Sequence, residues 1–351
     1  MSRFLSPRHR TLTAYTPGEQ PRVKLIKLNT NESPYPPSPE AVRALSPEAI
    51  ERFRLYSDIP TRDLSAATGE FYGVDPDRIL YGNGSDEILS FAFQAFGEAG
   101  VSFPDVTYGF YPVWTQLYGL KAAIRPVAAD FTIDPDDYRG GGLIVIANPN
   151  APTGIALPPE KIESLVRANP DSVVLIDEAY VDFGAASAVP LISKYENLMV
   201  VQTFSKSRSL AGARLGFAVA QPTLIEDLNR IKCSINPYNV GTPAQLLGAA
   251  AMRDRVYFDK TRSAIMETRE WTRAALETMG FSVLPSSANF LFTRLPGADG
   301  EALQRALRAR SILVRRFDLP RIRDYLRISI GTPEDMRALI SALSGILEGS
   351  V

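Results

Sequence analysis

The sequence predicts an α/β fold, with a large domain built on a mostly parallel central sheet and a smaller α+β domain after it. Three short, continuous apolar runs end in polar residues, and the segments between them are long enough for crossover helices. After Gly241 the pattern changes to a long alanine-rich helical stretch, followed by strand, helix and strand. A chain of 351 residues suits such a two-part architecture. We expect an N-terminal arm over 1–40, a large domain over 41–240 and a small domain over 241–351.

The beginning of the chain predicts an extended arm, and then a strand that leads into a helix. The first forty residues show little periodicity, and three prolines within "PYPP" exclude a helix there. "RILYGNG" reads as a strand and a turn before the helical segment "SDEILSFAFQAF". Ser85 is a candidate N-cap of this helix, with Asp86 and Glu87 in its first turn.

Strands and helices alternate through the rest of the chain. The three apolar runs are "GLIVIANPN" (Gly142–Asn150), "SVVLIDEAY" (Ser172–Tyr180) and "NLMVVQTFSK" (Asn197–Lys206), and each is typical of a parallel strand buried on both faces. From Gly241 to about Met279 we expect helix. Beyond it, "FSVLPSSANFLFTRL", "ILVRRF" and "YLRISIG" predict strands, and "GEALQRALRARS" predicts a helix.

The composition argues against several classes of partner and site. The formal net charge of −1 provides no attraction for nucleic acid or an anionic membrane, and no apolar run has membrane-spanning length. "MSRFLSPRHR" lacks the apolar core of a signal peptide and Cys233 is the only cysteine, so a cytoplasmic location is expected. His9 is the only histidine, which argues against Ser-His and Cys-His catalysis and against zinc. We predict no metal site, and chemistry based on other side chains or a cofactor.

The carboxyl ends of the three apolar strands carry the residues that point to chemistry. In chain order these are Asn148 and Asn150, then Asp177 and Tyr180, then Thr203, Ser205 and Lys206, with Arg214 eight positions further on. In open α/β sheets, ligands bind beyond the carboxyl ends of the strands. Pyridoxal phosphate is a ligand that uses an amine, a carboxylate, a phenol, hydroxyls and an arginine together. The pattern therefore predicts this cofactor.

Each predicted contact follows from a chemical need of the cofactor. Lys206 would form the Schiff base with the cofactor aldehyde, and Asp177 would keep the ring nitrogen protonated by charge pairing. Tyr180 would donate a hydrogen bond to the phenolic oxygen. The phosphate needs a helix N-terminus and an arginine. Its predicted ligands are the backbone amides of Gly84, Ser85 and Asp86 and the side chains of Thr203, Ser205 and Arg214.

Each of these residues also has an ordinary structural explanation. Lys206 and Arg214 could be solvated charges, and Asp177 could cap the next helix. Tyr180 could be a core aromatic with its hydroxyl at the rim. Such explanations account for one residue at a time, whereas the cofactor accounts for all of them on successive strand ends.

Nine motifs in a common order carry a resemblance to a known family. They are "AYTPGEQP", "IKLNTNESPYPPSP", "RLYSD", "ILYGNGSDEIL", "NPNAPTG", "DEAYVDF", "TFSKSRSLAGARLGF", "SANFLF" and "LRISIGTPED". By these motifs the chain resembles the fold-type I pyridoxal-phosphate aminotransferases, and specifically the histidinol-phosphate aminotransferase family, over nearly its whole length.

The resemblance implies further residues and a partner. Tyr108 should stack on the cofactor ring, and Tyr56 should reach the phosphate in the neighbouring subunit, which implies a homodimer with shared active sites. Arg327 should hold the α-carboxylate of the amino donor. Tyr15, Asn31 and Arg315 should border the substrate, with Arg315 a candidate for the substrate phosphate.

The chain departs from the family pattern at several positions near the site. Ala151 stands where the family usually has an asparagine that bonds the phenolic oxygen, so this role is transferred to Asn150. Gln202 replaces a common arginine, and Ser207 and Arg208 follow the lysine in place of alanine and phenylalanine. None of these changes removes a predicted catalytic group.

The resemblance implies a ping-pong aminotransferase of amino-acid biosynthesis that takes a small amino donor and a 2-oxo acid acceptor. Histidinol phosphate with 2-oxoglutarate is the expected pair, which would place the enzyme in histidine biosynthesis. A threonine-phosphate decarboxylase and an aromatic amino-acid aminotransferase are alternatives, because they use a very similar scaffold. A non-catalytic regulator with a cofactor-sensing domain would need a DNA-binding module, and the chain begins directly with the enzyme arm.

Overall fold

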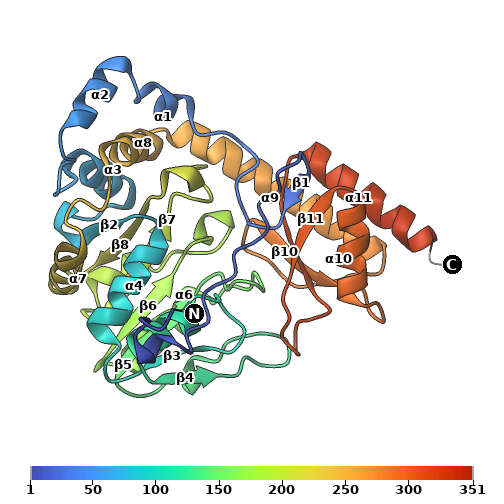
Figure 1. The fold of residues 1–351 in the computed structure, drawn as a ribbon, viewed down its shortest axis with the longest axis horizontal. Coiled ribbons are helices and arrows are strands. Elements are labelled where there is room, and N and C mark those ends of the chain that lie inside the picture. Colours follow the sequence, from blue (N-terminus) through green and yellow to red (C-terminus); the bar gives the residue numbers. More distant parts are fainter. Residues whose placement is uncertain (1, 350–351) are drawn as a thin grey trace.

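The computed structural model describes residues 2–349, which form two β-sheets connected by the long helix α9 (Arg255–Thr278) (Figure 1). A seven-stranded sheet and its helices form the larger part, and a five-stranded sheet with the last two helices forms the smaller part. The arm at the beginning of the chain passes between the two parts (Figure 1). The α/β fold class predicted from the sequence is confirmed.

The larger sheet has the strand order β2-β8-β7-β6-β5-β3-β4. β8 runs antiparallel to its two neighbours, and the other neighbouring pairs are parallel. The strands are β2 (Ile79–Gly82), β3 (Val101–Pro104), β4 (Ala122–Arg125), β5 (Gly142–Ala147), β6 (Ser172–Asp177), β7 (Leu198–Thr203) and β8 (Gly216–Ala220). The three predicted apolar runs are thus β5, β6 and β7, side by side in the sheet.

The continuous apolar character of these strands reflects burial on both faces. Along β5, Ile144 and Ile146 belong to one hydrophobic cluster, and Leu143 and Val145 belong to a second one. Because successive side chains of a strand point to opposite faces, the two clusters lie on the two sides of the sheet. Both faces therefore need helical cover, as expected for a sheet of parallel strands.

Helices alternate with the strands along the chain. Those of the larger part are α1 (Pro39–Arg43), α2 (Pro47–Glu51), α3 (Arg62–Tyr72), α4 (Ser85–Phe96), α5 (Tyr111–Tyr118), α6 (Pro159–Arg167), α7 (Pro222–Ile235) and α8 (Thr242–Arg253). α6 lies between β5 and β6, where the spacing predicted a crossover helix, whereas α1 to α3, α5, α7, β3, β4 and β8 were not individually predicted from the sequence. α8 packs against α3, and its Ala249 and Met252 belong to a core cluster of the larger sheet. The predicted domain boundaries at 40/41 and 240/241 stay predictions.

The smaller sheet has the order β1-β11-β12-β10-β9, in which only β1 and β11 are parallel. Its elements are β1 (Ile26–Leu28), β9 (Ser282–Val283), β10 (Phe290–Arg294), α10 (Gly300–Ala309), β11 (Ile312–Arg316), β12 (Leu326–Ser329) and α11 (Pro333–Glu348). The strand β1 comes from the N-terminal arm, so the arm is tied to the smaller sheet by its backbone.

The prediction that Ser85 caps α4 is wrong. Gly84 is the N-cap, Ser85 is the first helical residue, and no side chain caps this helix. The reason is steric: Gly84 has a φ of 82°, and an added Cβ would lie 2.5 Å from the guanidinium of Arg214. Only glycine tolerates that backbone and that close approach. Asp86 and Glu87 lie in the first turn, as predicted.

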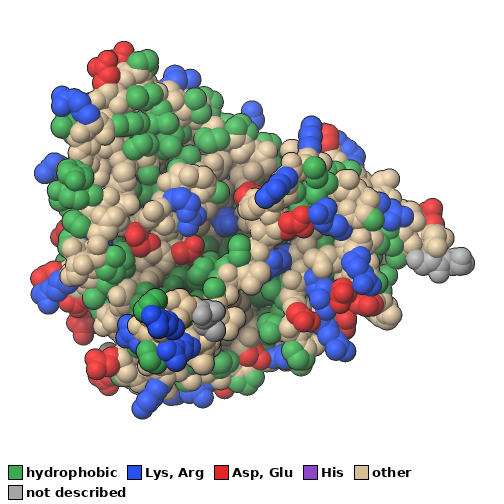
Figure 2. Space-filling model, in the orientation of Figure 1, with side chains coloured by type: hydrophobic (Ala, Val, Ile, Leu, Met, Phe, Trp, Pro, Cys, Tyr) green, Lys and Arg blue, Asp and Glu red, His purple; other side chains and the backbone are tan. Residues whose placement is uncertain are grey.

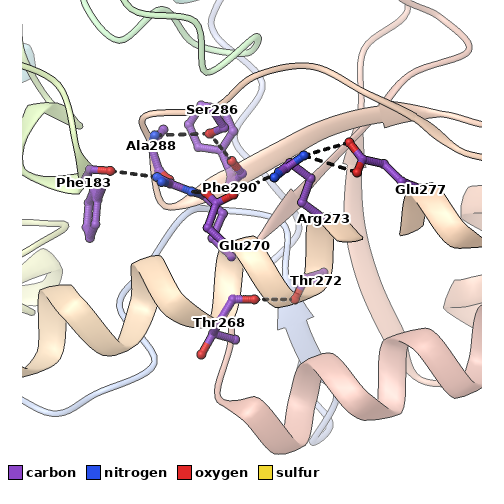
Figure 3. A network of polar contacts seen from close by, with 10 residues as sticks. Phe183, Thr268, Glu270, Thr272, Arg273, Glu277, Ser286, Ala288 and Phe290 are labelled. Atoms are coloured by element: carbon purple, nitrogen blue, oxygen red, sulfur yellow. Dashed lines mark hydrogen bonds and ion pairs between the residues drawn. The ribbon is translucent and has the colours of Figure 1, made fainter. Parts of the chain in front are cut away.

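The buried Arg269 of α9 connects the larger and the smaller part by hydrogen bonds. Its guanidinium donates to the carbonyl oxygens of Phe183 (2.7 Å) and Ala288 (2.9 Å). Phe183 ends the short 3₁₀ helix η5 (Val181–Phe183) beside the larger sheet, and Ala288 precedes β10 (Figure 3). This contact fixes the loop after β6 against the smaller sheet.

Within residues 2–349, no helix combines the length and apolar character that crossing a membrane requires.

Candidate active site

A cavity of about 620 Å³ lies between the two sheets, at the carboxyl ends of β5, β6 and β7 (Figure 2). Both sheets and the N-terminal arm contribute to its lining. Of the predicted site residues, those that line it are Tyr15, Ser85, Asp86, Tyr108, Asp177, Tyr180, Thr203, Ser205, Lys206, Arg214, Arg315 and Arg327. Residues from both sheets, from α4, from the loops after the strands and from the N-terminal arm therefore meet in one pocket, as a shared ligand would require.

Four predicted residues do not line this cavity. Gly84 lies directly behind Arg214, and Asn31 donates to the Tyr180 hydroxyl (3.0 Å), so both support residues that do line it. The buried amide of Asn150 donates instead to Val106 O and Thr153 Oγ1. Tyr56 is 82% exposed and stacks on Tyr238 at the outer surface.

Lys206 reaches the cavity from the loop directly after β7. Its Nζ donates to the carbonyl oxygen of Thr30 (3.3 Å) and lies 5.7 Å from the ring centre of Tyr180. No ion pair between Lys206 and a carboxylate occurs within residues 2–349. The amine is thus positioned by weak contacts and is available to a ligand.

Asp177 is a buried acid at the end of β6. Its carboxylate accepts hydrogen bonds from the Tyr111 hydroxyl (2.9 Å) and the Ala179 amide (3.3 Å). Burial raises the pKa of Asp177 to about 6, because the charged form loses water, and the Tyr111 hydrogen bond acts in the opposite direction. A cationic ligand atom beside this carboxylate would offset the free-energy cost of burying its charge. Tyr111 was missed from the sequence, since the helix α5 that carries it was not predicted and a lone tyrosine gives no chemical signal.

Arg214 and the beginning of α4 form the polar end of the cavity. The Arg214 guanidinium lies 3.2 Å from Asp86, and the Tyr108 hydroxyl donates to the other oxygen of that carboxylate (2.7 Å). The first amides of a helix have no partner inside the helix, and the helix dipole favours an anion there. Ser205 and Thr203 border the same end, where their hydroxyl oxygens lie 2.9 Å apart.

Arg327 and Arg315 bring two positive charges to the opposite wall. Arg327 Nη2 donates to Asn29 O (3.0 Å), and its Nε is buried without a hydrogen-bond partner in the described part of the chain. Burial lowers the pKa of Arg327. Among the described residues, 2–349, Arg315 donates only to backbone oxygens, those of Thr16 and Pro17. Two arginines without a carboxylate partner are suited to bind an anion.

Aromatic rings line the entrance that the arm covers. Tyr15 stacks on Phe110 with 4.2 Å between ring centres, and Tyr108 lies against both. Burial raises the pKa of Tyr15, so this hydroxyl is neutral at physiological pH. Phe110 was not predicted as a site residue, because a lone phenylalanine gives no chemical signal in a sequence.

Comparison with known proteins agrees with this arrangement. The profile of the family "Aminotransferase class I and II" matches residues 23–343. The chain belongs to the class I and II aminotransferases. It is 51% identical to histidinol-phosphate aminotransferase 1 of Bordetella parapertussis, with 99% of both chains covered. The family resemblance carried by the nine motifs is thereby confirmed.

Solved aminotransferase structures have the same fold. A putative histidinol-phosphate aminotransferase from Erwinia carotovora atroseptica superposes with a TM-score of 0.86 at 27% identity, covering 93% of this chain and 97% of that one. The histidinol-phosphate aminotransferase of Sinorhizobium meliloti, in complex with pyridoxal-5'-phosphate, gives a TM-score of 0.87 at 24% identity over 100% and 99% of the two chains. The two-sheet architecture is therefore that of this aminotransferase family.

Proposed function

We propose that this aminotransferase uses pyridoxal phosphate to move the amino group of histidinol phosphate to 2-oxoglutarate by a ping-pong cycle. The relatives that are about half identical over the full chain carry the name histidinol-phosphate aminotransferase, which supports this substrate. The observation that carries the proposal is that one cavity holds Lys206, Asp177 and Arg327, whose Nε has no hydrogen-bond partner within residues 2–349.

The residues present fit the cofactor in size and charge. Asp177 would pair with the protonated ring nitrogen, and Tyr108 would lie against the ring. Tyr180 would donate to the phenolic oxygen, with Asn31 holding its hydroxyl. The phosphate would lie at the beginning of α4 beside Arg214, whose guanidinium packs against Gly84 where a Cβ would otherwise stand. Asn150 remains a weaker candidate for the phenolic oxygen, since its amide is used inside the protein.

The chain's own groups then have defined tasks. When bound, pyridoxal phosphate supplies a ring that withdraws the electrons released at the substrate Cα. Lys206 Nζ would take the proton from the substrate Cα and deliver it to carbon C4′ of the cofactor, which is general acid–base work by one amine between two neighbouring carbons. Asp177 stabilises positive charge on the ring nitrogen. The arm, through Tyr15, covers the cavity and limits the access of water.

The two arginines account for the anionic end of the substrate. Arg327, partly desolvated and without a carboxylate partner, would take the phosphate of histidinol phosphate in one half-reaction and the α-carboxylate of the amino acid in the other. Arg315 would add a second charge from the same wall. A phosphate monoester with two negative charges fits two guanidinium groups better than a plain aromatic amino acid does. Threonine phosphate would fit this wall as well, so decarboxylation must be tested directly.

The homodimer is part of the proposal. Hydrophobic side chains gather around α1 and α2 on the outer face of the larger part (Figure 2). The exposed members of this face are Val42, Ile50, Phe53, Leu55, Tyr56 and Ile59. An exposed apolar set of this kind favours an interface. A second copy that covers it would bring Tyr56 toward the neighbouring cavity. A cytoplasmic location agrees with the single exposed Cys233.

The test is a screen of amino donors with the purified protein loaded with pyridoxal phosphate. Histidinol phosphate should convert the absorbance of the bound cofactor, and 2-oxoglutarate should restore it. Phenylalanine and threonine phosphate serve as the comparison donors, with carbon dioxide measured in parallel. Carbon dioxide release from threonine phosphate, with no amino transfer from histidinol phosphate, would contradict the assignment.

A further inference from the structure

A second pair of polar residues lies directly behind the candidate catalytic groups. Glu178 follows Asp177 on β6, and Gln202 precedes Thr203 on β7. The parallel ladder pairs Asp177 with Val201, and the Glu178 amide continues it with a 2.7 Å hydrogen bond to Val201 O. Because side chains alternate along a strand, Glu178 and Gln202 point away from the cavity that Asp177 and Thr203 line.

These two side chains are buried and completely hydrogen-bonded. Gln202 donates to Glu178 (2.8 Å), while its own oxygen accepts from the Tyr72 hydroxyl (2.5 Å). The Glu178 carboxylate also accepts from Ser187 Oγ and from the Ala188 amide, both at 2.6 Å. Glu178 and Gln202 are only 2% and 3% exposed. The chain of hydrogen bonds runs from α3 through both strand ends to the loop before Val189.

A second contact connects the same two segments one step further along. Ser207, the residue after Lys206, donates to Asp182 (2.5 Å). Asp182 belongs to η5, two residues after Tyr180. Two hydrogen bonds therefore join the segment after β6 to the end of β7 and the loop that follows it. One connects Glu178 with Gln202, and the other connects Asp182 with Ser207.

Burying these polar groups lowers the free energy of unfolding, so stability by itself does not explain their presence. Burial raises the pKa of Glu178 to about 7, because neutral donors replace water only in part and Asp182 lies nearby. Apolar side chains of similar volume would avoid this cost. What hydrogen bonds add is direction, since they hold donor and acceptor within a narrow range of distance and angle. Such precision is useful where two groups must act on one ligand.

We propose that Glu178 and Gln202 are positioning residues that hold the ends of β6 and β7 together and so set the place of Asp177 relative to Lys206. The inference rests on the proposed function, since it assigns them to the same cofactor site. Neither residue touches the cavity. They act through their neighbours in the chain, and a small displacement there is enough to misalign the reacting groups.

An amide–carboxylate exchange tests this role with little change in volume. Glu178→Gln places an amide among donors, one of which, the Ala188 N–H, can only donate. Gln202→Glu added to it restores one carboxylate and one amide in reversed order, with the Tyr72 hydroxyl as a donor to the new carboxylate. The control is Asn169→Leu, which removes two buried hydrogen bonds near the amino end of β6, far from the cavity.

Three quantities separate positioning from stability: the pH titration of the bound cofactor's absorbance, kcat against KM, and the unfolding temperature of the cofactor-free protein. Glu178→Gln should move the pH midpoint and lower kcat on the order of ten- to a hundredfold, with KM for the amino donor almost unchanged. The exchanged double variant should recover both. Asn169→Leu should lower only the unfolding temperature.

Other outcomes would overturn the proposal. A Glu178→Gln protein that loses stability like Asn169→Leu but keeps the wild-type titration and kcat shows a purely structural role. If Glu178→Gln does not fold, Tyr72→Phe removes one donor of the chain, and an unchanged titration and kcat in that variant has the same meaning. A wild-type protein that shows no cofactor absorbance overturns the proposed function together with this inference, whereas unchanged variants overturn the inference alone.

Discussion

Arg315 and Arg327 are directly opposite each other in the antiparallel pair formed by β11 and β12. Directly opposed residues of such a pair have their Cβ atoms about 4.5–5.5 Å apart on the same face of the sheet. In the sequence they stand at the two ends of the passage "VRRFDLPRIRDYLR", and the family resemblance assigned them to two different anionic groups, the substrate phosphate and the α-carboxylate. The structure instead brings both to one wall of the cavity, so they are suited to bind one doubly charged group.

This relationship predicts the effect of Arg315→Ala. The loss of one charge-assisted contact should cost roughly 2–4 kcal/mol, so KM for histidinol phosphate should rise about thirty- to a thousandfold. KM for phenylalanine should rise far less, because its single carboxylate can rely on Arg327. The control is Arg316→Ala, since Arg316 is the next residue of β11 and donates to Arg323 O outside the cavity. Steady-state kinetics with both donors measures the difference, and equal effects on the two would contradict phosphate recognition by Arg315.

Lys206→Ala should retain pyridoxal phosphate but lose turnover. The phosphate contacts near Arg214 do not depend on the lysine, whereas the covalent and proton-transfer tasks do. A loss on the order of 10⁴-fold or more in kcat is expected. Single-turnover measurements with histidinol phosphate test this, and equilibrium dialysis checks that the cofactor is still bound. Turnover close to that of the wild type would show that Lys206 is not the catalytic amine.

Asp177→Asn should raise the free energy of unfolding of the cofactor-free protein at neutral and alkaline pH. The folded pKa of about 6 lies above the ordinary value of 3.8, so burial disfavours the charged form in the cofactor-free protein. That penalty is absent below about pH 4, grows as the pH rises, and is complete above pH 6, where it is on the order of 3 kcal/mol. The cofactor-free variant should therefore be more stable than the wild type at pH 8, and the difference should vanish near pH 4.

The same variant should be a poor catalyst, because an amide cannot hold a proton on the ring nitrogen. Denaturant unfolding at the two pH values and turnover at pH 8 are the two measurements. If Asp177→Asn lowered stability at pH 8 and left turnover unchanged, Asp177 would be a structural cap.

Tyr111→Phe should weaken the cofactor site without disturbing the fold. The lost hydroxyl leaves one Asp177 oxygen without its donor, which costs about 1–3 kcal/mol and raises the pKa of Asp177 further. Affinity for pyridoxal phosphate should remain, since its phosphate contacts are intact, while kcat should fall about tenfold or more. The control is Tyr118→Phe. Tyr118 lies on α5 like Tyr111, but its hydroxyl bonds Ser90 of α4 and not Asp177. Equal kinetic effects in the two variants would exclude a specific role for Tyr111.

Tyr56 provides the test of shared active sites. The variants Tyr56→Ala and Lys206→Ala should each be impaired alone. When mixed under conditions that exchange subunits, they should regain activity, because one site of the mixed dimer combines an intact Lys206 with an intact Tyr56. Sedimentation measures the dimer, and an inactive mixture of confirmed mixed dimers would place Tyr56 outside the neighbouring site.

The meeting of the candidate site residues at one edge of the larger sheet could be predicted from the sequence. Asp177 and Lys206 each follow an apolar run, and parallel strands bring their carboxyl ends to one edge, so the two residues had to meet once the runs were recognised as neighbours. The edge of the larger sheet was less predictable. The edge strand β4 is exposed or half-exposed along its whole length, so it has no apolar run to mark it.

The amino-acid sequence by itself determined the family and the strand ends that carry the candidate site residues, because these depend on short motifs and on the local alternation of buried strands and helices. Only the tertiary structure decided that Arg315 lies opposite Arg327, that Tyr111 donates to Asp177, and that Glu178 pairs with Gln202 behind the cavity. Each of these pairs joins residues from different strands or helices. Their distance is set by strand register and by the packing of whole elements, which no local pattern encodes.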